Sequence, residues 1–209
     1  PPGRIDSDTE LTWAEFSMKV NTMCDYFKSK GWDKVENPVM LYGHKSVNML
    51  VAIYALMKLE VEYIPIDVIY PHDRIAKIAK IAKSQLVINT TSTPLALENT
   101  SEIQLANHGI AIVSEKEMMT NRSNNEDPTV YIIFTSGSTG EPKGVQISTE
   151  AVQSFTRWMS EDFGYTSTDV FVNSAVLSFD LSVFEVMTFG ALGATLDRKS
   201  TRLNSSHRC

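Results

Sequence analysis

An apolar, β-rich run that ends in a loop of glycines and hydroxyl groups is the feature that most constrains this chain. Residues 129–134 (TVYIIF) have the composition of a strand buried on both faces. Residues 135–144 (TSGSTGEPKG) follow, with three glycines, four hydroxyl side chains and one lysine. Because glycine permits positive φ and leaves backbone N–H groups uncovered, such a loop after a buried strand indicates a concavity suited to phosphate oxygens.

We predict that this loop binds phosphate through seven residues: Thr135, Ser136, Gly137, Ser138, Thr139, Gly140 and Lys143. The alternative is a flexible surface turn, which is what short glycine-rich loops usually form. The interrupted hydrophobic strand, the repeated hydroxyls and the Pro-Lys-Gly ending favour the phosphate site. The loop is not a Walker A motif, because its lysine is followed by Gly144 rather than by serine or threonine.

The overall composition narrows the class of protein. The chain has 209 residues, of which 43% are hydrophobic and 21% charged, which suffices for one sizeable core. Its net charge of −6 argues against a nucleic-acid-binding face. The two cysteines, Cys24 and Cys209, form no disulfide framework, and we find no signal peptide or bilayer-spanning apolar run. We therefore expect a cytoplasmic protein without a transmembrane segment.

Strand and helix signals alternate along the chain, which predicts a layered α/β fold with mostly parallel sheets flanked by helices. We expect helices at 12–31, 46–59, 71–83, 149–163 and from about 180 to 190, and strands at 38–42, 62–67, 85–89, 109–113, 129–134, 145–147 and 169–173. Weak periodicity predicts mainly a loop at 90–107, and 121–127 reads as a polar linker. In the fourth helix, we expect a Thr149 cap and a core-facing set made of Val152, Phe155, Trp158 and Met159.

A second candidate site residue is Asp180. An amino-acid substrate carries an ammonium group, which a buried anion must balance because an unpaired buried charge is very unfavourable. Asp180 stands between Phe179 and Leu181 at the start of an apolar helix, a suitable place for that anion. It could instead be a helix N-cap, and the two roles are compatible. His44 follows a strand, where ligands of α/β proteins bind, but a lone histidine is more often structural.

The loop 135–144 resembles the signature loop of the adenylate-forming enzymes, which include acyl-CoA synthetases, luciferases and the adenylation domains of peptide synthetases. Shorter strings, such as 42–44 (YGH), 63–67 (YIPID) and 178–183 (SFDLSV), resemble the D-alanine–D-alanyl carrier protein ligases within that family. The resemblance covers residues 9–196. It implies that the loop holds the β and γ phosphates of ATP and that Asp180 holds the α-amino group of the substrate.

The resemblance also implies a reaction. ATP, with Mg²⁺, would activate D-alanine or another amino acid to the aminoacyl-AMP. The aminoacyl group would then pass to the phosphopantetheine thiol of a carrier protein, in support of lipoteichoic acid D-alanylation. Two departures leave the amino acid open: residues 173–177 (NSAVL) replace a Gln-Ala-Pro segment, and Phe184 replaces a methionine. The alternatives are a peptide-synthetase adenylation domain for another amino acid, a non-catalytic phosphate-binding module and an unstable gene fragment.

Both ends of the chain look unlike those of a complete gene product. It begins with Pro1 rather than methionine, and residues 197–207 (DRKSTRLNSSH) resemble the in-frame translation of a sequencing adapter. We therefore expect residues 1–196 to be a partial N-terminal adenylation domain and 197–209 to be read-through. The family's adenine, ribose and lysine motifs would lie beyond Leu196. We accordingly assign no catalytic residue and no metal ligand within the chain.

Overall fold

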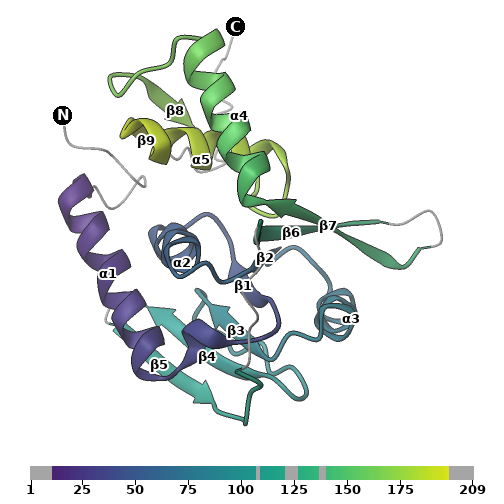
Figure 1. Ribbon diagram of the computed structural model, residues 1–209. Helices are drawn as coiled ribbons and strands as arrows, with labels where there is room; N and C mark the ends of the chain where they lie inside the picture. Colours follow the sequence, from purple (N-terminus) through teal and green to yellow (C-terminus); the bar gives the residue numbers. More distant parts are fainter. Residues whose placement is uncertain (1–10, 107–108, 121–126, 137–139, 198–209) are drawn as a thin grey trace, which may run out of the picture.

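Parallel strand pairing at the centre of one sheet organises the fold. The computed structural model describes residues 11–106, 109–120, 127–136 and 140–197. Its main strands are β1 (Val39–Gly43), β2 (Tyr63–Asp67), β3 (Leu86–Asn89), β4 (Ser101–Ala106), β5 (Gly109–Ser114), β6 (Thr129–Ser136) and β7 (Pro142–Ser148). They form one sheet in the order β5-β4-β3-β1-β2-β6-β7 (Figure 1). The central pairs are parallel and the two outermost pairs, β4–β5 and β6–β7, are antiparallel, which confirms the predicted α/β fold.

Helices cover both faces of this sheet. α1 (Trp13–Ser29) and α2 (Val47–Lys58) lie on one face and α3 (His72–Ala82) lies on the other (Figure 1). Leu41 and Ile88 belong to the hydrophobic cluster of α1 and α2, whereas their chain neighbours Met40 and Val87 belong to the cluster of α3. Because successive side chains of a strand point to opposite faces, central strands covered on both sides must be apolar throughout.

The helix starts follow from their capping residues. Thr12 and Glu15 form the predicted capping box: the Thr12 hydroxyl accepts from the Glu15 N–H, and the Glu15 carboxylate accepts from the Thr12 N–H at 2.7 Å. Ser46 caps α2 by accepting from the Met49 N–H at 3.0 Å. α3 begins after Pro71, whose missing N–H costs nothing at that position.

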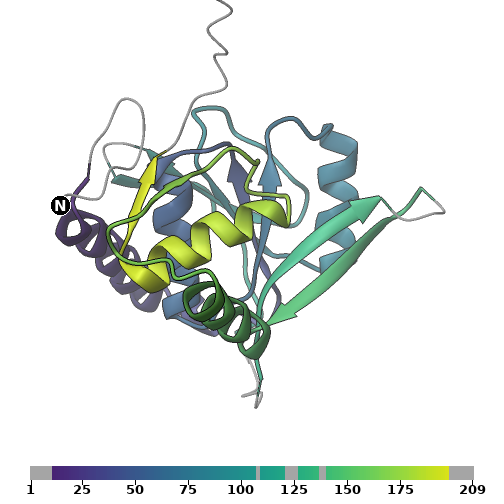
Figure 2. The same cartoon turned by 90° about the horizontal axis from the view of Figure 1, so that it is seen from above.

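A second group of elements lies above the β6–β7 end of the sheet. It contains α4 (Thr149–Asp162), α5 (Leu181–Leu192) and a small parallel sheet of β8 (Val170–Val172) and β9 (Thr195–Asp197) (Figure 1). Figure 2, seen from above, shows the β6–β7 hairpin extending away from the rest of the molecule. β6 pairs with β2 at a single position, Tyr63 with Tyr131, so the hairpin diverges from the sheet and leaves space above its surface.

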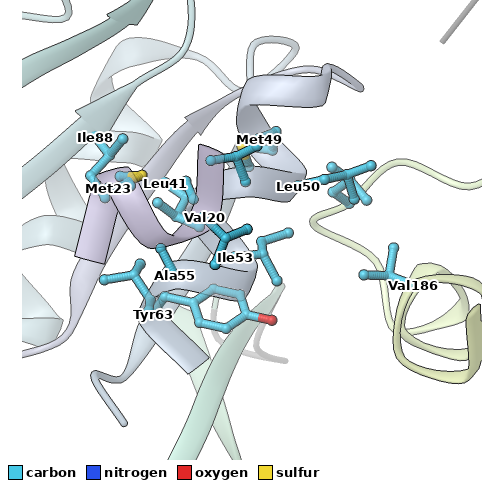
Figure 3. Packing of buried hydrophobic residues seen from close by; sticks show 14 of the residues in the cluster. Val20, Met23, Leu41, Met49, Leu50, Ile53, Ala55, Tyr63, Ile88 and Val186 are labelled. Atoms are coloured by element: carbon cyan, nitrogen blue, oxygen red, sulfur yellow. The ribbon is translucent and has the colours of Figure 1, made fainter. Parts of the chain in front are cut away.

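One hydrophobic core joins the two groups. In Figure 3, Val20 and Met23 of α1 and Met49 and Ile53 of α2 pack around β1 and β3. Val186 of α5 belongs to the same cluster, so α5 is fixed against the body of the molecule. This contact determines where the residues at the start of α5 lie relative to the sheet.

Three expectations about local structure are wrong. Residues 101–106, expected within a loop, form β4. The carboxylate of the buried Glu102 accepts hydrogen bonds from the N–H groups of Leu95 and Ala96. Because these bonds satisfy the carboxylate, a strand with polar residues can be buried. Ser148, not Thr149, caps α4 by accepting from the Ala151 N–H.

The third error concerns the core-facing side of α4. Val152 and Met159 are buried as predicted, but Trp158 is 47% exposed and packs against Phe163 at the end of the helix. Two sequence predictions fall largely on residues outside the description: residues 121–126 of the linker expected at 121–127, and residues 198–209 of the expected read-through segment. Asp197, the first residue of that segment, ends β9 and pairs with Val172.

Candidate functional site: a cavity between the phosphate loop and α5

The predicted phosphate loop connects the two strands of the β6–β7 hairpin. Thr135 and Ser136 are the last residues of β6, and both are exposed. They pair with Lys143 and Pro142 of β7. Gly137, Ser138 and Thr139 lie outside the described residues. The described residues therefore place two hydroxyl side chains and one lysine at the end of the hairpin where the loop connects β6 to β7.

Gly140 has the backbone conformation that the sequence predicted for a loop glycine. Its φ is +80°, and a β-carbon built on it would meet no atom within 4 Å. The requirement for glycine thus comes from the left-handed backbone and not from crowding.

Strand pairing places Lys143 and Thr135 on the same face of the hairpin, because directly paired residues share a face. Their closeness is confirmed by the hydrogen bond that the Thr135 hydroxyl donates to the Lys143 carbonyl at 3.4 Å. The Lys143 side chain is exposed. The same face continues toward the body of the molecule with Ile133 and Val145, then with Tyr131 and Ile147.

This hairpin face forms one side of a cavity of about 510 Å³. Tyr131, Ile133 and Thr135 line it from β6, and Ser178, Phe179 and Asp180 line it from the segment before α5. The cavity thus brings together two motifs that the sequence singled out separately, the start of the phosphate loop and the Ser-Phe-Asp string.

Asp180 is the N-cap of α5. Its carboxylate accepts a hydrogen bond from the Leu181 N–H at 2.8 Å, so the capping role considered from the sequence is present. The expected burial is not: Asp180 is exposed, and its neighbours Phe179 and Leu181 are 55% and 70% exposed. The carboxylate lies at the margin of the cavity, because the turn at 176–180 carries the chain along its edge before α5 begins.

A second cavity of about 380 Å³ adjoins the first and shares Tyr131, Ile147 and Asp180 with it. Its other lining residues are mainly apolar and include Phe155 of α4 and Phe184 of α5, whose rings meet edge to face at 6.4 Å. Phe184, which the resemblance expects to be a methionine, thus forms part of the wall of an apolar chamber next to Asp180.

Tyr131 stands between the two cavities. Burial, together with the nearby Asp180 carboxylate, raises the pKa of the Tyr131 hydroxyl to about 12. The phenol is therefore neutral at physiological pH and can donate a hydrogen bond within either cavity.

Buried polar contacts, which sequence reasoning missed, hold the segment that leads to Asp180. The Lys45 ammonium donates to the carbonyl groups of Asn173, at 3.1 Å, and Ser174. The Glu185 carboxylate accepts from the Ser174 N–H at 3.2 Å and from the Asn173 side-chain amide. A glutamate within the otherwise apolar α5 was the signal available in the sequence, because a buried carboxylate requires donors.

His44 takes part in a different arrangement. Its Nδ1 atom lies 2.8 Å from Oδ2 of Asp67, a 2% exposed carboxylate at the end of β2. Asp67 also accepts from the Ile69 N–H at 3.1 Å. His44 lines neither of the two cavities, which agrees with the structural role considered from the sequence.

The described residues do not fit a metal held by the protein alone, because they contain no group of three or more His, Cys, Asp or Glu side chains able to hold an ion. None of the helices in the described ranges combines the length and apolar character needed to cross a bilayer.

Comparison with known proteins identifies the class to which this fold and cavity belong. The family described as AMP-binding enzyme matches residues 3–206, and the chain belongs to that family. The match overlaps the segment expected to be read-through, whose origin stays a prediction.

The curated proteins that resemble this chain carry the name of one kind of ligase. The chain is 34% identical over 200 residues to the D-alanine–D-alanyl carrier protein ligase of Bacillus licheniformis, with 92% of this chain and 38% of the relative covered. It is 35% identical over 194 residues to the protein of that name from Bacillus velezensis, with 90% and 38% covered. The chain thus spans well under half the length of these relatives.

Solved structures share the fold. The crystal structure of CmiS6 matches 94% of this chain and 48% of its own length, with a TM-score of 0.82 and 20% identity. The peptide synthetase FmoA3, in a form bound to α-methyl-L-serine-AMP, matches 96% of this chain and 22% of its own, with a TM-score of 0.79 and 23% identity. These matches confirm the layered architecture inferred from the sequence.

Proposed function

We propose that the protein containing this chain activates D-alanine with ATP and transfers it to a carrier protein. The observation that carries the proposal is the single cavity shared by Thr135, Ser136 and Asp180. A hydroxyl-rich loop suits phosphate, and a carboxylate suits an ammonium group. Their juxtaposition matches a reaction between a nucleotide and an amino acid, and the names of the similar Bacillus proteins support this choice of substrate.

In the proposed reaction, a carboxylate oxygen of D-alanine attacks the α phosphorus of ATP. A new P–O bond forms, the bond to the β phosphate breaks, and D-alanyl-AMP and pyrophosphate result. The thiol of a phosphopantetheine group then attacks the acyl carbon, so that a thioester forms, the thiol gives up its proton and AMP leaves. Mg²⁺, when bound with the nucleotide, would offset phosphate charge.

The residues of this chain bind and orient the reactants. The loop at 135–143 holds the triphosphate in line with the attacking carboxylate, and the Lys143 ammonium balances part of its charge. Asp180 pairs with the ammonium of the amino acid, whose transfer out of water would otherwise be very unfavourable. The apolar chamber beside Asp180 would receive the side chain of the substrate, and the lysine that completes catalysis in the family would lie outside this chain.

The proposed setting is the cytoplasm, where the D-alanyl carrier protein would deliver its cargo for lipoteichoic acid D-alanylation in the cell wall. One observation favours a second candidate, a peptide-synthetase adenylation domain for a different amino acid. Phe184 forms part of the chamber next to Asp180, and a change in that wall alters which side chain fits.

Exchange of labelled pyrophosphate into ATP tests the proposal. The complete gene product is assayed with D-alanine, L-alanine, glycine, L-serine and larger amino acids. The proposal expects exchange that is strongest with D-alanine, whereas strongest exchange with another amino acid selects the second candidate. Absence of exchange with every amino acid would contradict both. The 209-residue chain, assayed in parallel, should show no exchange above a heat-killed control.

A further inference from the structure

Arg74 lines the cavity that contains the start of the phosphate loop and Asp180, although no motif pointed to it. It belongs to the first turn of α3, and its guanidinium lies over the Tyr70 ring, 4.5 Å from the ring centre. One of its terminal nitrogens donates to the Phe134 carbonyl at 3.4 Å. Because Phe134 directly precedes Thr135, this contact places the guanidinium at the loop end of the cavity.

Not every N–H donor of the Arg74 guanidinium has a hydrogen-bond acceptor in the described part of the chain. The Nε–H of Arg74 is buried and finds no hydrogen-bond partner in the described part of the chain. A guanidinium has five N–H donors in a rigid, planar arrangement, and a buried charged donor without an acceptor is unfavourable. The helix also disfavours a cation here, since the N-terminal end of its dipole is positive. The Tyr70 ring and the Phe134 carbonyl explain part of the position of this guanidinium, but the described local structure gives no reason for a buried Nε–H donor here.

An anionic ligand would give such a reason. Another cation of α3, Lys77, lies 3.4 Å from the Glu141 carboxylate, with which it forms an exposed ion pair. Lys143 lies directly opposite Thr135 on the hairpin face. A triphosphate carries more negative charge than one lysine balances, and a planar guanidinium matches phosphate oxygens in pairs.

We propose that Arg74 binds the phosphate chain of the nucleotide as a second cation beside Thr135, Ser136 and Lys143. This inference rests on the proposed phosphate site, but not on which amino acid is activated. Tyr70 and the Phe134 carbonyl hold the guanidinium in place, and its remaining N–H groups meet the phosphate oxygens.

Direct binding of inorganic triphosphate to the complete gene product tests the inference, with Arg74→Gln, Arg74→Lys and Lys80→Gln compared by calorimetry. Arg74→Gln should raise the Kd roughly ten- to a hundredfold, the range expected for a hydrogen bond to a charged group. Arg74→Lys should fall between it and the unaltered protein. Lys80→Gln removes a cation from the same helix outside the cavity and should leave the Kd unchanged. A Kd for Arg74→Gln within about twofold of the original would overturn the inference.

A measurement on the unaltered protein covers the case in which the Arg74 variants do not fold. Phenylglyoxal modifies arginine, and peptide mass spectrometry reports each site separately. Inorganic triphosphate should protect Arg74 but not Arg157, an exposed residue of α4 outside this cavity. Equal modification of Arg74 with and without triphosphate, or protection by D-alanine alone, would overturn the inference.

These results are separable from those of the exchange assay. Triphosphate binding that depends on Arg74, in a protein without amino-acid-dependent exchange, would sink the proposed function and leave this inference standing. Exchange with D-alanine, together with triphosphate binding that does not change when Arg74 is substituted, would support the proposed function and overturn this inference.

Discussion

Tyr131 and Asp180 both line two adjoining cavities, and the negative charge of the Asp180 carboxylate acts together with burial to raise the pKa of the Tyr131 hydroxyl to about 12. A carboxylate and a neutral phenol thus both line the two cavities, whose smaller member is otherwise mainly apolar. A zwitterionic ligand placed there would find an anion for its ammonium and a hydrogen-bond donor for its carboxylate.

The raised pKa of Tyr131 predicts how stability changes with alkaline pH. The pKa of Tyr131 in the folded state lies above the ordinary value near 10. Its contribution to the free energy of unfolding is therefore fully present below pH ~10 and is lost as the pH rises through about 12. Tyr131→Phe should therefore lose less stability over this interval than the unaltered chain. Urea denaturation at pH 8, 10 and 11.5 provides the measurement. An identical loss in both proteins would show that the phenol titrates normally.

Much of the fold could be predicted because local signals and burial agree. The capping box at Thr12 and the apolar run at 129–134 are sequence features that the structure reproduces. β4 could not be predicted in this way, because its stability depends on hydrogen bonds that the N–H groups of an irregular loop donate to the Glu102 carboxylate. Such contacts between segments leave no periodic pattern.

The candidate site was predictable only in parts. The loop at 135–143 and Asp180 each carry a recognisable motif, but their common cavity depends on the divergence of β6 from β2 and on the packing of Val186. Arg74 was overlooked because it stands among lysines that read as a solvated helix face. Its position in the first turn, where the helix dipole opposes a cation, was the signal that could have singled it out.

The substitution Gly190→Ala should destabilise the fold. A β-carbon on Gly190 would lie 1.8 Å from the Tyr54 hydroxyl oxygen, which donates to the Val186 carbonyl at 2.6 Å. Overpacking of this kind costs about 1–3 kcal/mol. On an open helix face the same change would instead stabilise by about 0.5–1 kcal/mol, so the sign of the effect is diagnostic. The free energy of unfolding in urea gives that sign.

A matched background for this test is Tyr54→Leu, which removes the end of the ring that occupies the space. In that background Gly190→Ala should cost measurably less, because two residues in contact have non-additive effects. Equal costs in both backgrounds would show that Tyr54 is not the obstacle.

Changes in the phosphate loop should weaken ATP binding. Lys143→Ala removes a charge from the hairpin face and should raise the Kd for ATP roughly ten- to a hundredfold in the complete gene product. Gly140→Val should act through the backbone, because a β-branched residue is strongly disfavoured at a φ of +80°. Lys80→Ala is the control, because it removes an exposed lysine of α3 that belongs neither to the hairpin nor to the lining of the cavity. Unchanged ATP affinity in both loop variants would support the alternative of a simple surface turn.

The substitution Asp180→Asn separates the two roles of that residue. Asparagine and aspartate cap helices about equally, so the bond to the Leu181 N–H and the melting temperature should be retained. The change removes the negative charge that the proposed function places opposite the ammonium of D-alanine. The Asp180 carboxylate is exposed at the margin of the cavity, so its loss should not have the large effect of breaking a buried ion pair. We expect an effect equal to the loss of one hydrogen bond between charged groups, which is roughly a ten- to hundredfold fall in kcat/KM for D-alanine.

Asp169→Asn is the matched control for Asp180→Asn. Asp169 also accepts a hydrogen bond from a backbone N–H, that of Thr166 at 2.7 Å, but it lies outside both cavities. Pyrophosphate exchange, ATP affinity and melting temperature are measured for the two variants side by side. Asp180→Asn should affect exchange far more than ATP affinity, and Asp169→Asn should affect neither. If kcat/KM falls less than about threefold, which is under 1 kcal/mol, Asp180 is a helix cap that the substrate does not use.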